Sequence, residues 1–213
     1  MLNSGRDIAL ASVLSALAGY VDGIGYLHLG GLFVSFMSGN STRMGVNIAE
    51  GRFQSAAEAF GLIALFVVGA AAGSLIVLGQ SRQAQGRVLL AETLLLVAGG
   101  LFHGFDLDDF AIAAIVLAMG LENAVFQIEG GSGLGLTYVT GALVKVGQFI
   151  AAALTGGARF AWVPNLLLWA ALVVGSVAGA LAYVWINLAA IWFAAVAALA
   201  LSVLLGVAAL RAH

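Results

Sequence analysis

The sequence predicts an all-α integral membrane protein with six transmembrane helices and two re-entrant half-helices, built as two inverted repeats in a single membrane domain, 1–213. The first observation is composition: 62% of the residues are hydrophobic and 8% are charged, whereas soluble domains carry about 25% charged residues. The second is that polar or glycine-rich breaks divide the chain into eight apolar segments. The third is that two polar motifs, far apart in the chain, match each other in chemistry.

The apolar segments differ in their ability to cross a membrane, which takes about 20 apolar residues. Five of them meet this length and the fourth is just short, but the second is short and polar, and the sixth carries Lys145 in its middle. We therefore expect six spans, with the second and sixth segments entering and leaving on one side. The segments are 7–29, 33–49, 53–79, 86–102, 109–128, 133–154, 161–185 and 187–210.

The two polar motifs are 33–45, FVSFMSGNSTRMG, and 136–147, LTYVTGALVKVG. When the two motifs are aligned without a gap, hydroxyl residues align with hydroxyl residues, aromatic residues with aromatic residues, and cationic residues with cationic residues. This match predicts two copies of one unit, 7–104 and 108–211. The matched pairs are Ser35 and Thr137, Phe36 and Tyr138, Ser38 and Thr140, Gly39 and Gly141, Arg43 and Lys145, and Gly45 and Gly147.

A second match supports the repeat. Residues 67–73, VVGAAAG, correspond to residues 173–179, VVGSVAG, and both contain the GxxxG pattern that lets helices approach closely in lipid. We expect these two glycine faces to pack against each other or across a dimer.

The distribution of arginine predicts the topology, since cytoplasmic loops are rich in Lys and Arg. With two re-entrant segments, both termini and residues 80–87 lie in the cytoplasm, residues 103–109 lie outside, and Arg52 is the one loop arginine outside. Each unit then has three spans, so the second is inverted relative to the first. Inverted repeats with broken helices near the bilayer midplane are typical of transporters, and we expect a multi-pass protein of the bacterial inner membrane.

The polar motifs are the expected binding site. Ser and Thr are good helix N-caps, and helix N-termini attract anions, so two inverted helix starts facing each other predict a midplane site for a small polar or anionic solute. The alternative is that these hydroxyls only hydrogen-bond neighbouring helices. The expected substrate-binding residues are Ser35, Ser38, Gly39, Asn40, Arg43, Thr137, Tyr138, Thr140, Gly141 and Lys145.

Two of these residues are cations at membrane depth. Arg43 and Lys145 each cost about 3 kcal/mol to insert, so we expect them to face a cavity or a carboxylate; snorkelling to the interface is the alternative. Asn40 has no polar counterpart in the second motif, where Ala142 stands. That asymmetry makes Asn40 a candidate for contacting a non-symmetric substrate.

Three acids are expected inside the membrane. Asp22 lies in the stretch GYVDG, and its counterpart in GLENA is Glu122 or Asn123; Glu92 is the third acid. We expect Asp22, Glu122 and Asn123 to act in coupling. The acids either couple transport to protons or neutralise the membrane cations, and the sequence leaves both alternatives open.

Three stretches carry a resemblance to a family. Residues 19–27, GYVDGIGYL, residues 36–43, FMSGNSTR, and residues 136–145, LTYVTGALVK, resemble the YoaK-like family of bacterial inner-membrane proteins of unknown function. The resemblance covers nearly the whole chain and implies an inner-membrane protein of this size, without a substrate. Family members often have glutamine where this chain has Glu122, which implies that a carboxylate there is not essential to the family's activity.

These observations favour a small secondary transporter, with a channel or facilitator, or a non-transporting structural membrane protein, as alternatives. We expect no enzyme, because nucleophile elbows, His-Glu metal motifs and phosphate-binding glycine loops are absent from the sequence. The chain has no cysteine and its three histidines lack a ligand spacing, so we expect no metal or cofactor. The net charge of −2 gives no indication of nucleic-acid binding, and we expect none. The expected partners are a small-molecule or ion substrate, bilayer lipid and, as one alternative, a second copy of the chain.

Overall fold

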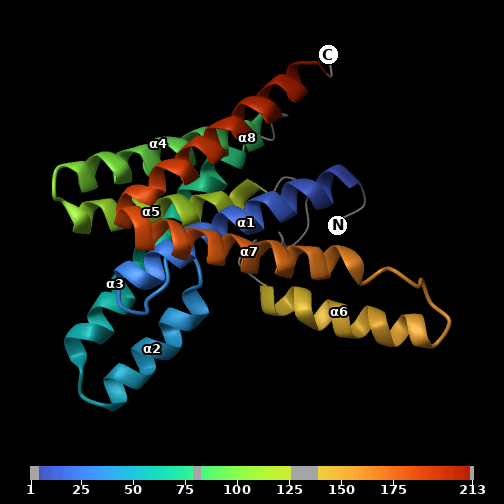
Figure 1. Ribbon diagram of the computed structural model, residues 1–213, viewed down its shortest axis with the longest axis horizontal. Coiled ribbons are helices and arrows are strands. Elements are labelled where there is room, and N and C mark those ends of the chain that lie inside the picture. The colour runs from blue at the N-terminus through green and yellow to red at the C-terminus, as the bar shows by residue number, and fades with distance from the viewer. Residues whose placement is uncertain (1–4, 79–82, 126–138, 212–213) are drawn as a thin grey trace.

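The computed structural model describes residues 5–78, 83–125 and 139–211, and the regular elements in these ranges are all helices (Figure 1). The expected all-α class is confirmed for this part of the chain. The elements are α1 (Gly5–His28), α2 (Met37–Ala49), α3 (Phe53–Val77), α4 (Ala84–Gly104), α5 (Asp108–Glu122), α6 (Val139–Leu154), α7 (Val163–Ile186), the 3₁₀ turn η2 (Asn187–Ala190) and α8 (Ile191–Arg211).

Within the described residues, four helical stretches are long and apolar enough to cross a membrane. Three of them are α1, α3 and α4, and the fourth is a 47-residue stretch that contains α7 and most of α8. In contrast, α2, α5 and α6 have 13, 15 and 16 residues, which makes them about 20, 23 and 24 Å long. All three are shorter than the hydrocarbon core of about 30 Å, so length alone separates neither α5 from the short helices nor six spans from five. The expected membrane class agrees with the four long stretches.

Helix α7 packs on α1 through glycines. A Cβ atom added to Gly175 would lie 2.0 Å from the carbonyl oxygen of Ala16, and one added to Gly179 would lie 2.0 Å from that of Tyr20. Gly19 on α1 returns the contact, since its added Cβ would lie 2.2 Å from the carbonyl oxygen of Leu172. The two backbones therefore touch along this crossing, which any larger residue would separate.

Helix α3 packs on α5 in the same way. Cβ atoms added to Gly69 and Gly73 would lie 2.2 Å and 2.6 Å from the carbonyl oxygens of Leu117 and Leu121. The two GxxxG faces therefore contact α5 and α1 of their own chain. The expectation that they pack on each other or across a dimer is wrong, because a GxxxG pattern specifies close approach without specifying the partner helix.

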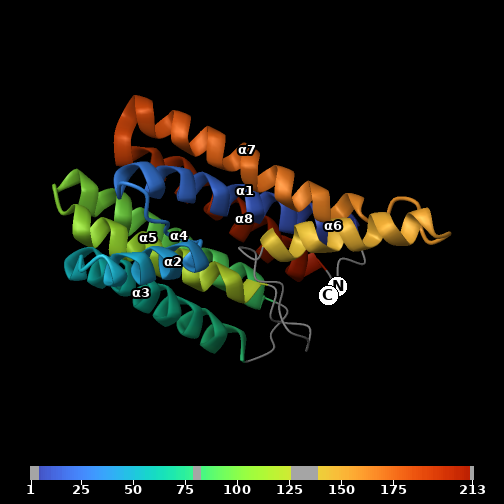
Figure 2. The same ribbon diagram turned by 90° about the horizontal axis from the view of Figure 1, so that it is seen from below.

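The helices run roughly along one direction, and the start of α1 and the end of α8 lie at the same end of the molecule (Figures 1 and 2). The connection between α4 and α5 lies at the other end. Helix α2 begins about midway along the molecule and runs toward the α4–α5 connection, whereas α6 begins about midway and runs in the opposite direction (Figure 2). The largest fully buried apolar side chains come from α1, α4, α5 and the η2–α8 corner; they are Leu14, Ile24, Leu89, Leu96, Ile115, Met119, Leu188 and Ile191.

Candidate functional site

The connection from α1 to α2 begins with a glycine stop. The N–H of Gly31 donates to the carbonyl of Tyr26 at 2.8 Å, and Gly30 and Gly31 have φ values of +61° and +105°. Glycine adopts this left-handed region without steric cost and commonly ends helices in this way. The chain therefore leaves α1 sharply after His28 and turns back toward the middle of the molecule.

Asp22 fixes the end of this connection. Its Oδ1 atom accepts the backbone N–H groups of Val34 at 2.9 Å and Ser35 at 2.7 Å, and its Oδ2 atom accepts the Ser35 hydroxyl at 2.5 Å. The Asp22 side chain is buried on α1. The donors just before α2, where we expect an anion to bind, are therefore satisfied by a carboxylate of the chain itself.

Asn40 and Gly39 hold the same connection from the α2 side. The Asn40 amide donates to the Phe33 carbonyl at 2.7 Å and accepts the Phe33 N–H at 2.9 Å. Gly39 lies beneath two aromatic rings, since an added Cβ would come within 2.6 Å of Phe36 and 2.9 Å of Phe33. Asn40 is fully buried and uses its amide within the chain, so the structure places it behind the connection.

A cavity of about 580 Å³ lies where α1 and α7 meet the starts of α2 and α6. Both polar motifs contribute to it, through Ser35 and Phe36 before α2 and through Thr140 on α6, while Thr137 and Tyr138 lie outside the described residues. In the described part of the structure, residues of both motifs therefore line one cavity. The described lining residues are Asp22, Gly23, Tyr26, Leu27, Phe33, Ser35, Phe36, Val139, Thr140, Leu143, Trp169, Leu172, Ser176 and Ala180.

The two membrane cations lie away from this cavity's described lining. Arg43 is exposed, and its guanidinium lies against the backbone of Gly31. Lys145 is half-buried on α6, and neither cation forms a salt bridge with a carboxylate in the described ranges. Ser38 is exposed on α2, and neither it nor Gly141 lines the cavity. A binding role for these residues stays a prediction.

Two further acids are completely buried. Glu92 on α4 and Glu122 on α5 have 0% exposure, and no group in the described ranges hydrogen-bonds any of their four carboxyl oxygens. Glu122 lies within electrostatic range of both Asp22 and Glu92. Asn123 donates its amide to the Met119 carbonyl at 2.9 Å. Glu92 is outside the expected coupling set, although an acid in an apolar segment is a sequence signal for an intramembrane role.

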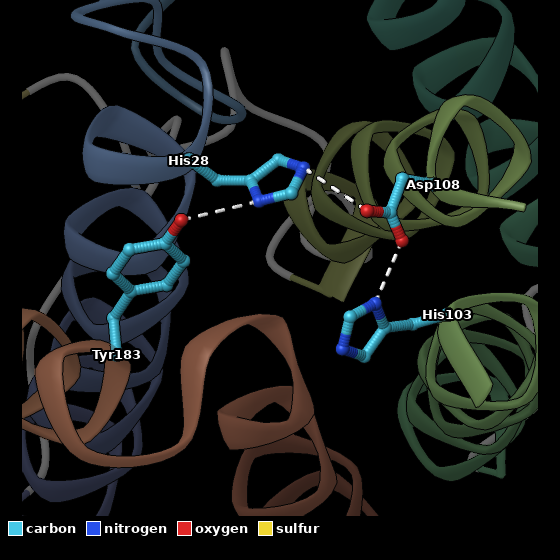
Figure 3. Close-up of polar contacts among 4 residues, drawn as sticks. All are labelled: His28, His103, Asp108 and Tyr183. Carbon is cyan, nitrogen blue, oxygen red and sulfur yellow. Dashed lines mark hydrogen bonds and ion pairs between the residues drawn. The ribbon is translucent and has the colours of Figure 1, made fainter. Parts of the chain in front are cut away.

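A polar network joins four helices at the end of the molecule that carries the α4–α5 connection. Asp108 lies between two histidines, 2.7 Å from Nδ1 of His103 and 4.0 Å from Nε2 of His28 (Figure 3). The Tyr183 hydroxyl lies 3.3 Å from the other ring nitrogen of His28. Residues from α1, α4, α5 and α7 are thus held together at this end.

A second cavity, of about 380 Å³, lies beside this network. His28, Glu58, Asp108 and Asp109 line it together with Leu29 and Leu32. Residues 26–36 thus contribute to both cavities: Tyr26, Leu27, Phe33, Ser35 and Phe36 to the first, and His28, Leu29 and Leu32 to the second. We call this segment the shared wall.

Comparison with known proteins identifies the family. The family model described as "Protein of unknown function (DUF1275)" matches residues 10–204. The chain belongs to the DUF1275 family. The UPF0700 transmembrane protein RA0705 of Rhizobium meliloti (strain 1021) is 36% identical over 200 residues, which cover 93% of this chain and 86% of the relative. No solved structure matches the chain. The expected membrane class agrees with the name of this relative, which describes it as a transmembrane protein.

Proposed function

We propose that the chain is a small secondary transporter of the bacterial inner membrane that moves a small solute through the first cavity. The observation that carries this proposal is that the residues at the starts of α2 and α6 line one cavity with α1 and α7. Its volume of about 580 Å³ is within the range of small-molecule sites, about 300–1,000 Å³. Broken helices that meet near the bilayer midplane are a recurrent way to build transport sites.

The proposed architecture is a pair of inverted repeats with six spans, α1, α3, α4, α5, α7 and α8. Helix α1 packs on α7 through Gly175 and Gly179, and its counterpart α5 packs on α3 through Gly69 and Gly73. In each case the first span of one repeat packs on the second span of the other repeat: α1 on α7, and α5 on α3. A two-fold relation between the repeats requires this reciprocal packing. The opposite directions of α2 and α6 (Figure 2) support their assignment as re-entrant helices from the two sides of the membrane.

Glu122 is the proposed coupling group in this chain, although the resemblance to the YoaK-like family implies that other members work without a carboxylate at this position. An intramembrane acid is costly and is by default a functional candidate, and both oxygens of Glu122 lack hydrogen-bond partners in the described ranges. Its electrostatic interaction with Asp22 connects it to a residue that lines the cavity. A proton on Glu122 therefore changes the charge that acts on the solute site.

The topology can be checked by thiol labelling, because the chain has no cysteine. Gly5→Cys and Asp106→Cys are expected to react with a membrane-impermeant maleimide from opposite sides, Gly5→Cys from the cytoplasm. Arg159→Cys serves as a second cytoplasmic marker. Labelling of positions 5 and 106 from the same side would contradict the six-span architecture.

The transport path can be checked with thiols in the cavity. Thr140→Cys and Leu143→Cys line it, so an alternating-access transporter exposes each of them to impermeant reagent from either side of sealed vesicles. Val174→Cys on α7 is the matched control, since Val174 is 67% exposed and lies outside the cavity lining. A channel would additionally give single-channel currents in planar bilayers. Reaction from one side only would contradict a transport path and favour a structural role.

A further inference from the structure

We propose that the first cavity binds an organic monocation, an amine or quaternary ammonium ion that carries apolar groups. This inference names the substrate class of the proposed transport site, so it rests on that function for its biological meaning. The binding itself follows from the charge and the chemistry of the cavity wall.

Asp22 supplies the charge. It is the one charged side chain among the described residues that line the cavity. Two backbone N–H groups and one hydroxyl donate to its oxygens, and hydrogen bonds of this kind favour the ionised form of a carboxylate. The charge of the ionised form attracts an ammonium group and equally a quaternary ion that has no N–H.

Aromatic rings supply the rest of the site. Tyr26, Phe33, Phe36 and Trp169 line the same cavity. The rings of Tyr26 and Phe33 lie 5.1 Å apart, and those of Phe33 and Phe36 lie 5.3 Å apart at an angle of 82°, so the cluster presents ring faces in more than one direction. Aromatic faces attract cations, and cages of such rings recognise quaternary ammonium ligands.

The same geometry disfavours an anion. The N–H groups of Val34 and Ser35, which would otherwise hold one, already donate to Asp22, and Arg43 and Lys145 are not part of the described lining. An anion in this cavity would meet a carboxylate and the faces of aromatic rings. We therefore propose a cationic solute in place of the anionic solute that the sequence suggested.

The second cavity is acidic, so it can attract cations to the neighbourhood of the first cavity. It carries three carboxylates, Glu58, Asp108 and Asp109, beside His28. Clefts lined by one sign of charge raise the local concentration of the opposite ion. Because residues of the shared wall line both cavities, a cation gathered in the second cavity is close to the first.

The test uses the full-length chain in lipid nanodiscs and three probes of similar shape. Benzyltrimethylammonium is the cation, neopentylbenzene is its neutral carbon isostere, and benzenesulfonate is the anion. We expect the cation to bind at least about tenfold more tightly than the other two, a difference within the range of a desolvated cation–aromatic contact. Isothermal titration and displacement of radiolabelled benzyltrimethylammonium both measure it.

Variants tie the binding to the cavity. Trp169→Leu and Phe36→Leu are expected to weaken binding of the cation about tenfold each, whereas Phe60→Leu on the exposed face of α3 leaves it unchanged. These variants test the cavity without changing Asp22, so the test does not depend on whether Asp22→Asn folds. Tighter binding of benzenesulfonate that both cavity variants weaken would overturn the cationic class and leave the transporter proposal intact. Cation binding that neither variant changes, or no binding of any probe, would overturn the inference, and the thiol labelling of Thr140→Cys judges the transport path independently.

Discussion

Gly179→Ala is expected to lower the free energy of unfolding by roughly 3 kcal/mol or more. The new Cβ would lie 2.0 Å from the carbonyl oxygen of Tyr20, a separation that real structures do not allow. The obstacle is the backbone of α1, so no side-chain rotation relieves it, and the two helices must move apart along their whole crossing. The melting temperature in detergent and the yield of monodisperse protein measure the effect.

Gly206→Ala is the matched control. Gly206 also lies within an apolar helix, and an added Cβ there has nothing within 4 Å. Alanine has the higher helix propensity, so this substitution is expected to leave stability unchanged or slightly higher. Equal melting temperatures for Gly179→Ala and Gly206→Ala would show that α1 and α7 are not in backbone contact.

Removal of the Asp22 carboxylate has the second large expected effect. Asp22→Ala leaves the N–H groups of Val34 and Ser35 and the Ser35 hydroxyl without their acceptor in a buried site. A buried donor that loses its partner costs about 1–3 kcal/mol, so we expect a total loss of about 3 kcal/mol or more. The connection before α2 should also become a preferred site of proteolysis, which limited digestion followed by mass spectrometry will locate.

Two variants separate this effect from the mere loss of charge. Asp22→Asn keeps one carbonyl oxygen for the two backbone donors and is expected to recover more than half of the lost stability. Glu58→Ala removes an acid from an exposed position and is expected to change stability by less than about 0.5 kcal/mol. If Asp22→Ala were as stable as the wild type, the anchoring of the α1–α2 connection by Asp22 would be refuted.

Much of the helix arrangement follows from local sequence. Gly30 and Gly31 end α1 where the apolar run breaks, and the structure starts α2 at Met37, inside the expected segment 33–49. Hydropathy and glycine determine helix ends through interactions within a few residues, so these ends can be read from the sequence. The partners of the GxxxG faces were mispredicted because Gly73 fits any helix with a smooth surface, and the choice of α5 over α7 depends on the whole packing.

The matched motifs point to Ser35 and Thr140, and both residues line the first cavity. The chemistry of the cavity wall was harder to predict from the sequence. The hydrogen bonds that Ser35 donates to Asp22 join residues on different elements. They occupy the donors that the sequence suggested were available to an anion. The isolation of Glu92 from any described partner is likewise a tertiary property, although its presence in an apolar run marked it as unusual.

The shared wall lines both cavities. If residues 26–36 moved as a unit toward one cavity, they would reduce its volume and enlarge the other. Ligand binding in the first cavity and ligand binding in the second would then be coupled with opposite sign, and by reciprocity each ligand would lower the affinity of the other by the same factor.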